Sequence, residues 1–148
     1  KGVSIINEAV WHRDEILQFV PEGADAGRIS DGKGKGKSVA VQAKDIRKIL
    51  DEKGPFDYIK MDIEGAESVV MPACRGFLND TKYIFCEYHS TLESKQSLST
   101  ILGVLYDEGF RVHIKPIGAS KQPFVKIYDR FGFDMQLNIF AWKGESSE

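Results

Sequence analysis

One twelve-residue stretch, FDYIKMDIEGAE at positions 56–67, limits the possible folds of this chain more than any other. Its first half is a mostly apolar run, interrupted by Lys60, and predicts a strand buried on both faces of a parallel sheet. Asp62 and Glu64 follow at the carboxyl end of this strand, two residues apart, so they project from the same side of an extended chain. Gly65 permits a sharp turn, and the residues after it predict a helix. In open α/β sheets, ligands bind where strands end in this way.

A second predicted strand, at 83–89, also ends in ionisable groups. Glu87 and His89 are two residues apart and therefore lie on one side of that strand. Because sequential parallel strands end at the same edge of a sheet, we expect these side chains and the acidic pair to converge on one pocket. We predict Asp62, Glu64, Glu87 and His89 as catalytic residues, with His89 or Glu87 as the base. The alternatives are solvated loop acids and a strand-end histidine bonded to a loop.

A metal ion at this edge is a separate question. Asp62, Glu64 and Glu87 would offer the oxygen ligands that Mg²⁺ prefers. Nothing in their spacing requires an ion, so no metal ligand is predicted.

The rest of the chain alternates strands and helices. Apolar side chains at spacings of three and four predict helices over 43–53, from 66 onward with Pro72 as a kink, and over 94–109. Short apolar or alternating runs predict strands at 3–6, 16–20, 39–41, 110–117 and 137–142, with loops at 21–37 and 118–134. Such alternation gives right-handed crossovers and a parallel sheet with helices on both faces.

The string DYIKMDIEGAE resembles the hallmark "lKiDvEGaE" of the FkbM-like family of S-adenosylmethionine-dependent methyltransferases. The pair at 87 and 89 is similar to an "E-x-H" in that family, and FDMQLNIFA at 133–141 resembles the last strand of some members. The resemblance implies an α/β fold with a three-layer, Rossmann-like class I methyltransferase sheet whose last strand is antiparallel. It also implies S-adenosylmethionine as cofactor.

The segment NEAVW at 7–11 resembles the family's loop after the third strand, which lies beside the adenine of the cofactor. The resemblance therefore implies Asn7, Ala9 and Asp62 as cofactor-binding residues. From the residues alone, a strand end with Trp11 packed in the core is the alternative.

Two features of such methyltransferases are missing from this chain: a first strand with a glycine-rich turn, and a second strand ending in an acid for the ribose. A glycine-rich cofactor-binding turn follows an apolar strand and opens a helix. The alternate glycines at 32–36 do neither, so they are not interpreted as such a turn. We therefore expect residues 1–148 to form a single, partial methyltransferase domain that lacks the first two strand–helix units. The sheet would have an exposed apolar edge. A homodimer could cover this edge, or a rearrangement of the N-terminal hairpin that the strands at 16–20 and 39–41 would form around the loop at 21–37, unless the chain is a remnant of a longer protein.

The predicted function is methyl transfer to a hydroxyl of a sugar or another small molecule, although the isolated chain could be inactive without the cofactor loop. The alternative is a non-catalytic α/β remnant that binds a partner or dimerises. A nucleotide-dependent phosphotransferase is a weaker third reading, because the chain has no phosphate-binding loop.

Composition narrows the partners and the compartment. The net charge of −2 gives no support for a nucleic acid or an anionic membrane surface as partner. No apolar run is long enough to span a bilayer. Cys74 and Cys86 lack metal-ligand spacing and are interpreted as reduced core thiols of a cytoplasmic protein.

Overall fold

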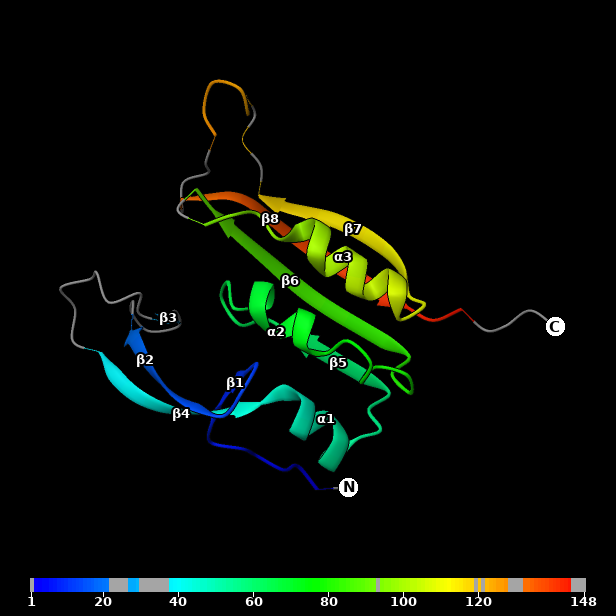
Figure 1. Cartoon of the computed structure of the whole chain (residues 1–148). Helices are drawn as coiled ribbons and strands as arrows, with labels where there is room; N and C mark the ends of the chain where they lie inside the picture. The colour runs from blue at the N-terminus through cyan, green and yellow to red at the C-terminus, as the bar shows by residue number, and fades with distance from the viewer. Residues whose placement is uncertain are drawn as a thin grey trace.

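The computed structural model describes residues 2–21, 27–29, 38–92, 94–118, 120, 122–127 and 132–144 (Figure 1). Strands precede, separate and follow the helices along this part of the chain. The elements are β1 (Ala9–Trp11), β2 (Glu15–Pro21), β3 (Gly27–Ile29), β4 (Val39–Asp45), α1 (Ile46–Lys53), β5 (Tyr58–Met61), α2 (Glu67–Ala73), β6 (Tyr83–Thr91), α3 (Leu98–Asp107), β7 (Arg111–Gly118) and β8 (Phe133–Trp142).

The described strands form two mixed sheets. The first has the order β1-β4-β2-β3, with β1 parallel to β4, and β2 antiparallel to both β4 and β3. The second has the order β5-β6-β8-β7, with β5 parallel to β6, and β8 antiparallel to both β6 and β7. The α/β class and the antiparallel last strand are therefore confirmed, whereas the expected partial, mainly parallel sheet is replaced by two mixed sheets.

The core lies on one face of the second sheet. Ile84, Cys86 and Tyr88 alternate along β6 and are buried, together with Leu137 and Ile139 of β8. They pack against buried side chains of α2 and α3, which lie together in front of this sheet in Figure 1. Alternate residues of a strand point to opposite faces, so the helices cover only the face to which these side chains point.

The opposite face of the second sheet is bare in the sense that no described helix covers it, although His89 at its carboxyl end is buried. Tyr58, Tyr83 and Phe140 are 55%, 54% and 40% exposed. The expectation of three layers, with helices on both faces, is therefore not met by this part of the chain. The prediction that the strand at 56–63 is buried on both faces is also wrong, because β5 is an edge strand that packs on one side only.

The N-terminal strand is displaced from its predicted place. Residues 2–7 form no strand, and Val3 and Ile5 are 91% and 86% exposed. The strand lies instead at Ala9–Trp11, where it pairs in parallel with Ala43–Asp45 of β4. The apolar run at 3–6 has no such ladder partner among the described residues, and an unpaired run does not form a strand.

The hairpin around 21–37 is confirmed, since Glu15–Phe19 of β2 pairs antiparallel with Val39–Ala43 of β4. The predicted connecting loop starts with Pro21, which still belongs to β2, and contains β3, and its remaining residues lie outside the described ones. Of the predicted loop at 118–134, residues 119, 121 and 128–131 lie outside the described ones, residue 118 still belongs to β7, and the last two residues already belong to β8.

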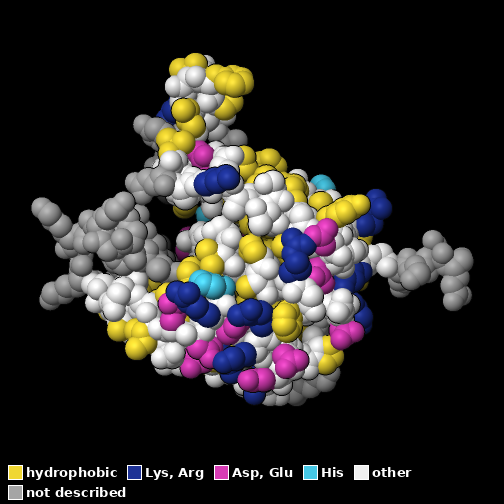
Figure 2. Space-filling view, viewed as in Figure 1, with side chains coloured by type: hydrophobic (Ala, Val, Ile, Leu, Met, Phe, Trp, Pro, Cys, Tyr) yellow, Lys and Arg dark blue, Asp and Glu magenta, His cyan; other side chains and the backbone are white. Residues whose placement is uncertain are grey.

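Helix α1 begins later than predicted, because residues 43–45 are still part of β4. The Asp45 side chain accepts a hydrogen bond from the backbone N–H of Arg47 at 2.9 Å and so caps the helix, which ends at Gly54. Charged side chains of both signs cover the lower part of the molecule, where α1 lies (Figure 2). Pro72 lies at the end of α2, where the helix stops at Ala73. No helix in the described part of the chain is long and apolar enough to cross a membrane.

Candidate active site

The carboxyl ends of β5 and β6 lie side by side. The two strands run parallel with Met61 opposite Cys86, so Asp62, which follows β5, comes beside Glu87 of β6. Single ligand atoms of Asp62, Glu87 and His89 all lie within 4.8 Å of one another. Glu64 belongs to the same group, because its Oε2 atom lies 4.0 Å from His89 Nε2. The structure thus brings together the four residues predicted as catalytic.

The turn after β5 shapes this group. Glu64 and Gly65 have φ values of +52° and +95°, and the N–H of Ala66 donates to the carbonyl of Ile63 at 3.3 Å. Positive φ at both central residues is the signature of a type I′ turn. A left-handed conformation is unfavourable for a glutamate, and strained residues of this kind cluster at functional sites. The turn places the Glu64 carboxylate near His89.

Glu67, the first residue of α2, is the buried anchor of the group. Its side chain has no exposed surface, and its Oε1 atom accepts a hydrogen bond from the backbone N–H of Ile63 at 2.9 Å. The same oxygen lies 3.6 Å from His89 Nδ1. Glu67 Oε2 and His89 Nδ1 are both buried without a hydrogen-bond partner among the described residues. The sequence places Glu67 only in the first helical turn, so its role beside His89 was missed.

Gln136 of β8, the strand that pairs with β6, also contacts the group. Its Nε2 atom lies 3.1 Å from Glu87 Oε1 and 3.3 Å from His89 Nε2. An amide nitrogen carries two hydrogens and no free lone pair, so Nε2 of His89 accepts in this arrangement. The imidazole proton then resides on Nδ1, which faces Glu67. The pattern of apolar residues gives no signal for Gln136, because its position opposite His89 depends on the β6–β8 register.

Burial and charge act in opposite directions on His89, which is 7% exposed. Burial alone would lower the pKa of the imidazole, but the carboxylates of Glu67, Glu64 and Glu87 outweigh it, so the pKa is raised above 6.5. A raised pKa makes the imidazole a stronger proton acceptor, which suits a group that takes a proton from a substrate.

Asp62 is more accessible than Glu87 and His89, with 29% of its side chain exposed against 21% and 4%. The Nζ atom of Lys60 contacts Asp62 Oδ2 at 2.9 Å, and this hydrogen bond and charge raise the pKa of Lys60. The pair is exposed on the bare face of the second sheet, one residue beyond the end of β5. The cluster therefore has an open side on which a ligand can approach Asp62.

Of the three residues assigned to cofactor binding by resemblance, Asp62 lies in the cluster, whereas Asn7 and Ala9 lie before or in the first sheet. Asn7 is exposed and precedes β1, whereas Ala9 is half-buried and pairs with Ala43. Strand β1 contacts α2, whose first residue is Glu67. Trp11 packs against the core and its Nε1 donates to Glu15 at 2.7 Å, which agrees with the structural alternative for that residue. Cofactor binding by Asn7 and Ala9 stays a prediction.

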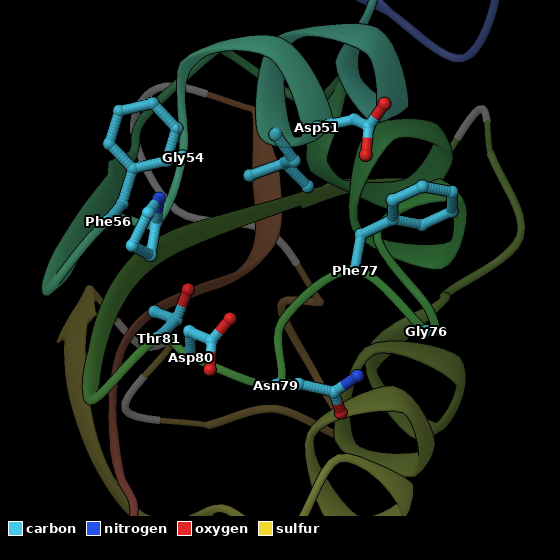
Figure 3. Close-up of a pocket in the computed structure, with 10 residues that line it drawn as sticks. Asp51, Gly54, Phe56, Gly76, Phe77, Asn79, Asp80 and Thr81 are labelled. Carbon is cyan, nitrogen blue, oxygen red and sulfur yellow. The ribbon is translucent and has the colours of Figure 1, made fainter.

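A hollow of about 290 Å³ lies elsewhere on the molecule (Figure 3). It is lined by Phe56 and Phe77 on opposite sides and by the carboxyl-bearing Asp51 and Asp80. These residues precede β5 and β6 or end α1, so the hollow is at the amino ends of the strands. It is therefore at the opposite end of β5 and β6 from Asp62.

Comparison with known proteins gives one match. A family model described as the Methyltransferase FkbM domain matches residues 4–112. This range includes β5, β6 and the residues at their carboxyl ends, and ends before β8. Neither the curated proteins nor the solved structures include a significant match to the chain.

Proposed function

This chain belongs to the FkbM methyltransferase domain family, and from that premise we propose that it transfers a methyl group from S-adenosylmethionine to a hydroxyl group of a sugar or another small molecule. The observation that carries the proposal is the convergence of Asp62, Glu64, Glu87 and His89 within the matched range. A convergent set of acids and an imidazole at the ends of adjacent parallel strands occupies the usual ligand position of an α/β sheet.

The residues present fit such a cofactor. S-adenosylmethionine supplies a methyl group on a positively charged sulfonium, and the cluster concentrates carboxylates around one edge of the sheet. Glu67 also leaves a buried oxygen without a partner among the described residues. The strand order β5-β6-β8-β7 with its antiparallel β8 supports our view that the second sheet is the later part of a Rossmann-like class I methyltransferase sheet.

Methyl transfer to a hydroxyl needs two things from the protein: alignment of the reacting groups and a destination for the hydroxyl proton. Asp62, on the open side of the cluster, is the group that we assign to contacts with cofactor or acceptor. In the arrangement described here, His89 Nε2 is the candidate base, since it already accepts a hydrogen bond from Gln136. Once protonated, the imidazolium would be stabilised by Glu67 behind it and by Glu64 and Glu87 beside it.

Calorimetry with S-adenosylmethionine tests the proposal directly. We expect micromolar binding to the chain and weaker binding to Asp62→Asn. Asp57→Asn is the matched control, because Asp57 is an exposed carboxylate at the other end of β5, where it pairs with Lys82. Transfer of a labelled methyl group to a panel of hydroxyl compounds then identifies the acceptor. Absence of both binding heat and a thermal shift would favour the non-catalytic alternative.

That alternative, a partner-binding or dimerisation module, is favoured by one observation. Tyr58 and Tyr83 are more than half exposed and lie opposite each other on β5 and β6, and β5 is the edge strand of this sheet among the described strands. Exposed aromatic side chains that lie side by side are common in protein–protein interfaces. For this alternative we propose that the chain forms a homodimer through this face. Analytical ultracentrifugation of the native chain and of Tyr58→Lys tests it: the native chain should sediment as a dimer and the variant as a monomer. A native chain that is monomeric at all concentrations would rule out the dimer.

The compartment is part of the same proposal. Cys74 and Cys86 are both buried and free, which supports a reducing environment. We propose the cytoplasm, and fractionation of cells that express the chain checks it.

A further inference from the structure

We propose that Asp62, Glu87 and His89 form a binding site for a divalent first-row transition metal ion, with Mn²⁺ as the representative ion. These three side chains offer two carboxylates and one imidazole, and their ligand atoms lie within 4.8 Å of one another. They come from two neighbouring strands, so their backbone positions are held by the β5–β6 ladder. Two carboxylates also balance the charge of a divalent cation.

The orientation of His89 supports its use as a ligand. His89 is 7% exposed, yet its Nδ1 atom has no hydrogen-bond partner among the described residues, and neither has Oε2 of the fully buried Glu67. Histidines that bind metals commonly donate their other ring N–H to a carboxylate. Here Nδ1 faces Glu67 Oε1 at 3.6 Å, while Nε2 faces the carboxylates of Glu87 and Glu64. The ring is therefore already oriented with Nε2 as the ligand atom.

Polar groups of the protein occupy the place of the cation in the structure described here. Lys60 Nζ contacts Asp62 at 2.9 Å, and Gln136 Nε2 contacts both Glu87 and His89. Ligand bonds of about 2.1 Å allow two ligand atoms to be at most about 4.2 Å apart, so the cluster must contract by a few tenths of an ångström around an ion. Rotation of the exposed Lys60 and of the Gln136 amide would permit that contraction.

The mixed ligand set favours some ions over others. Mg²⁺ and Ca²⁺ prefer oxygen ligands alone, whereas an imidazole nitrogen suits Mn²⁺, Fe²⁺, Co²⁺ and Zn²⁺ better. Three protein ligands leave coordination positions open, as catalytic metal sites do. The site is therefore expected to prefer Mn²⁺ over Mg²⁺.

The role of the ion, unlike its binding, rests on the proposed methyl transfer. A metal-bound hydroxyl has a lowered pKa, so the ion would do the work otherwise assigned to the imidazole. With His89 as a ligand, the hydroxyl proton would pass to the exposed carboxylate of Glu64. The oxygen lone pair would form the new bond to the methyl carbon while the methyl–sulfur bond breaks and leaves its electron pair on sulfur.

Titration of the metal-free chain with Mn²⁺, followed by the loss of the free-ion electron paramagnetic resonance signal, tests binding without any substrate. We expect one site, with affinity reduced at least about tenfold in Asp62→Asn and in Glu87→Gln. Lys60→Met should bind Mn²⁺ more tightly, because it frees Asp62. Lys82→Met is its control, since Lys82 makes a similar exposed pair with Asp57 at the other end of the strands.

Asp62 is exposed, so Asp62→Asn is expected to fold, and circular dichroism of each variant checks this. Equal Mn²⁺ affinity in Asp62→Asn and in the carboxylate control Glu52→Gln would overturn the site, as would no binding at millimolar Mn²⁺. Methyl transfer that survives complete metal removal would overturn the catalytic role of the ion alone. Metal binding with no methyl transfer to any acceptor would instead count against the proposed function and leave the site intact.

Discussion

His89 Nδ1 lies 3.6 Å from Oε1 of Glu67, a carboxylate with no exposed surface. The same oxygen accepts the backbone N–H of Ile63, the residue that begins the acidic turn. Glu67 is the first residue of α2, and it therefore links that helix to the imidazole on β6 and to the turn after β5. A change at Glu67 is expected to affect both the stability of the turn and the chemistry of His89.

The first prediction concerns Glu67 itself. In Glu67→Ala the N–H of Ile63 loses its acceptor and a buried space opens, so we expect a loss of about 1–3 kcal/mol in the free energy of unfolding. Glu67→Gln keeps an oxygen acceptor and should lose less. Urea unfolding of both variants measures the difference. Equal stability of Glu67→Ala and the native chain would contradict the buried hydrogen bond.

Methyl transfer separates the two roles of Glu67. Glu67→Gln removes the charge behind His89, so it should slow transfer more than it weakens cofactor binding. A variant that binds the cofactor normally and transfers at the native rate would show that Glu67 is structural only.

The second prediction concerns Asp62, which is exposed and pairs at the surface with Lys60. Asp62→Asn should change the free energy of unfolding by less than about 0.5 kcal/mol, because exposed substitutions away from special features have small effects. Cofactor binding or methyl transfer should nevertheless fall markedly. Thermal unfolding checks the stability of Asp62→Asn, and calorimetry on the same sample checks its cofactor binding. A stability loss as large as that of Glu67→Ala would mean that Asp62 holds the fold instead.

The positions of the acids at the ends of β5 and β6 could be predicted, because each depends only on the sequence of its own strand and of the turn that follows. An apolar run of strand length followed by a glycine turn places Asp62 and Glu64 at a strand end, and the same logic places Glu87 and His89. Parallel neighbours then bring the two ends together. The family resemblance and the α/β class follow from this same stretch and are confirmed.

Features that depend on distant pairing could not be predicted. Gln136 is 47 residues from His89, and only the β6–β8 register places its amide between His89 and Glu87. The apolar run at 3–6 is a good local strand, but the parallel partner β4 pairs with Ala9–Trp11 instead. From the sequence, Glu67 fits both an exposed acid at a helix N-terminus and a buried hydrogen-bond partner. The pattern of apolar residues around it does not distinguish the two.

The third prediction concerns the cap of α1. Asp45 is 6% exposed, and its carboxylate accepts from the backbone N–H of Arg47 and from the guanidinium of the same residue. Asp45→Ala should cost about 1–2 kcal/mol of stability, the usual value for loss of an N-cap. Asp51→Ala, an exposed site in the same helix, is the control and should cost much less.

The cost of Asp45→Ala should also depend on pH. The hydrogen bonds from Arg47 lower the pKa of Asp45 below 3.8 in the folded state. A lowered pKa stabilises the fold above the unfolded-state value, and this contribution is lost as the pH falls through the folded-state pKa. The stability difference between the native chain and Asp45→Ala should therefore be constant near pH 6 and shrink below about pH 4. Unfolding curves at several pH values measure it, and a difference that grows in acid would contradict the cap.

The fourth prediction concerns the two thiols, which lie on the covered side of the second sheet. Burial raises the pKa of Cys74 to about 12, and burial followed by the charge of Glu67 raises the pKa of Cys86 still further. The reactive form of a cysteine is its thiolate, so both side chains should be almost inert at pH 8 in the folded protein. A disulfide-exchange reagent should label neither thiol of the native chain and both thiols in guanidinium chloride.

The protection expected for Cys86 in the native chain also tests the packing of the core. Cys86 lies between Phe85 and Glu87 on β6, with its side chain turned toward the helices, so it reacts only when the sheet separates from α2 and α3. Its labelling rate should rise in Glu67→Ala, which loosens the contact between α2 and β6, and should be unchanged in Asp62→Asn. Rapid labelling of Cys86 in the native chain would show that the helices do not cover this face of the sheet.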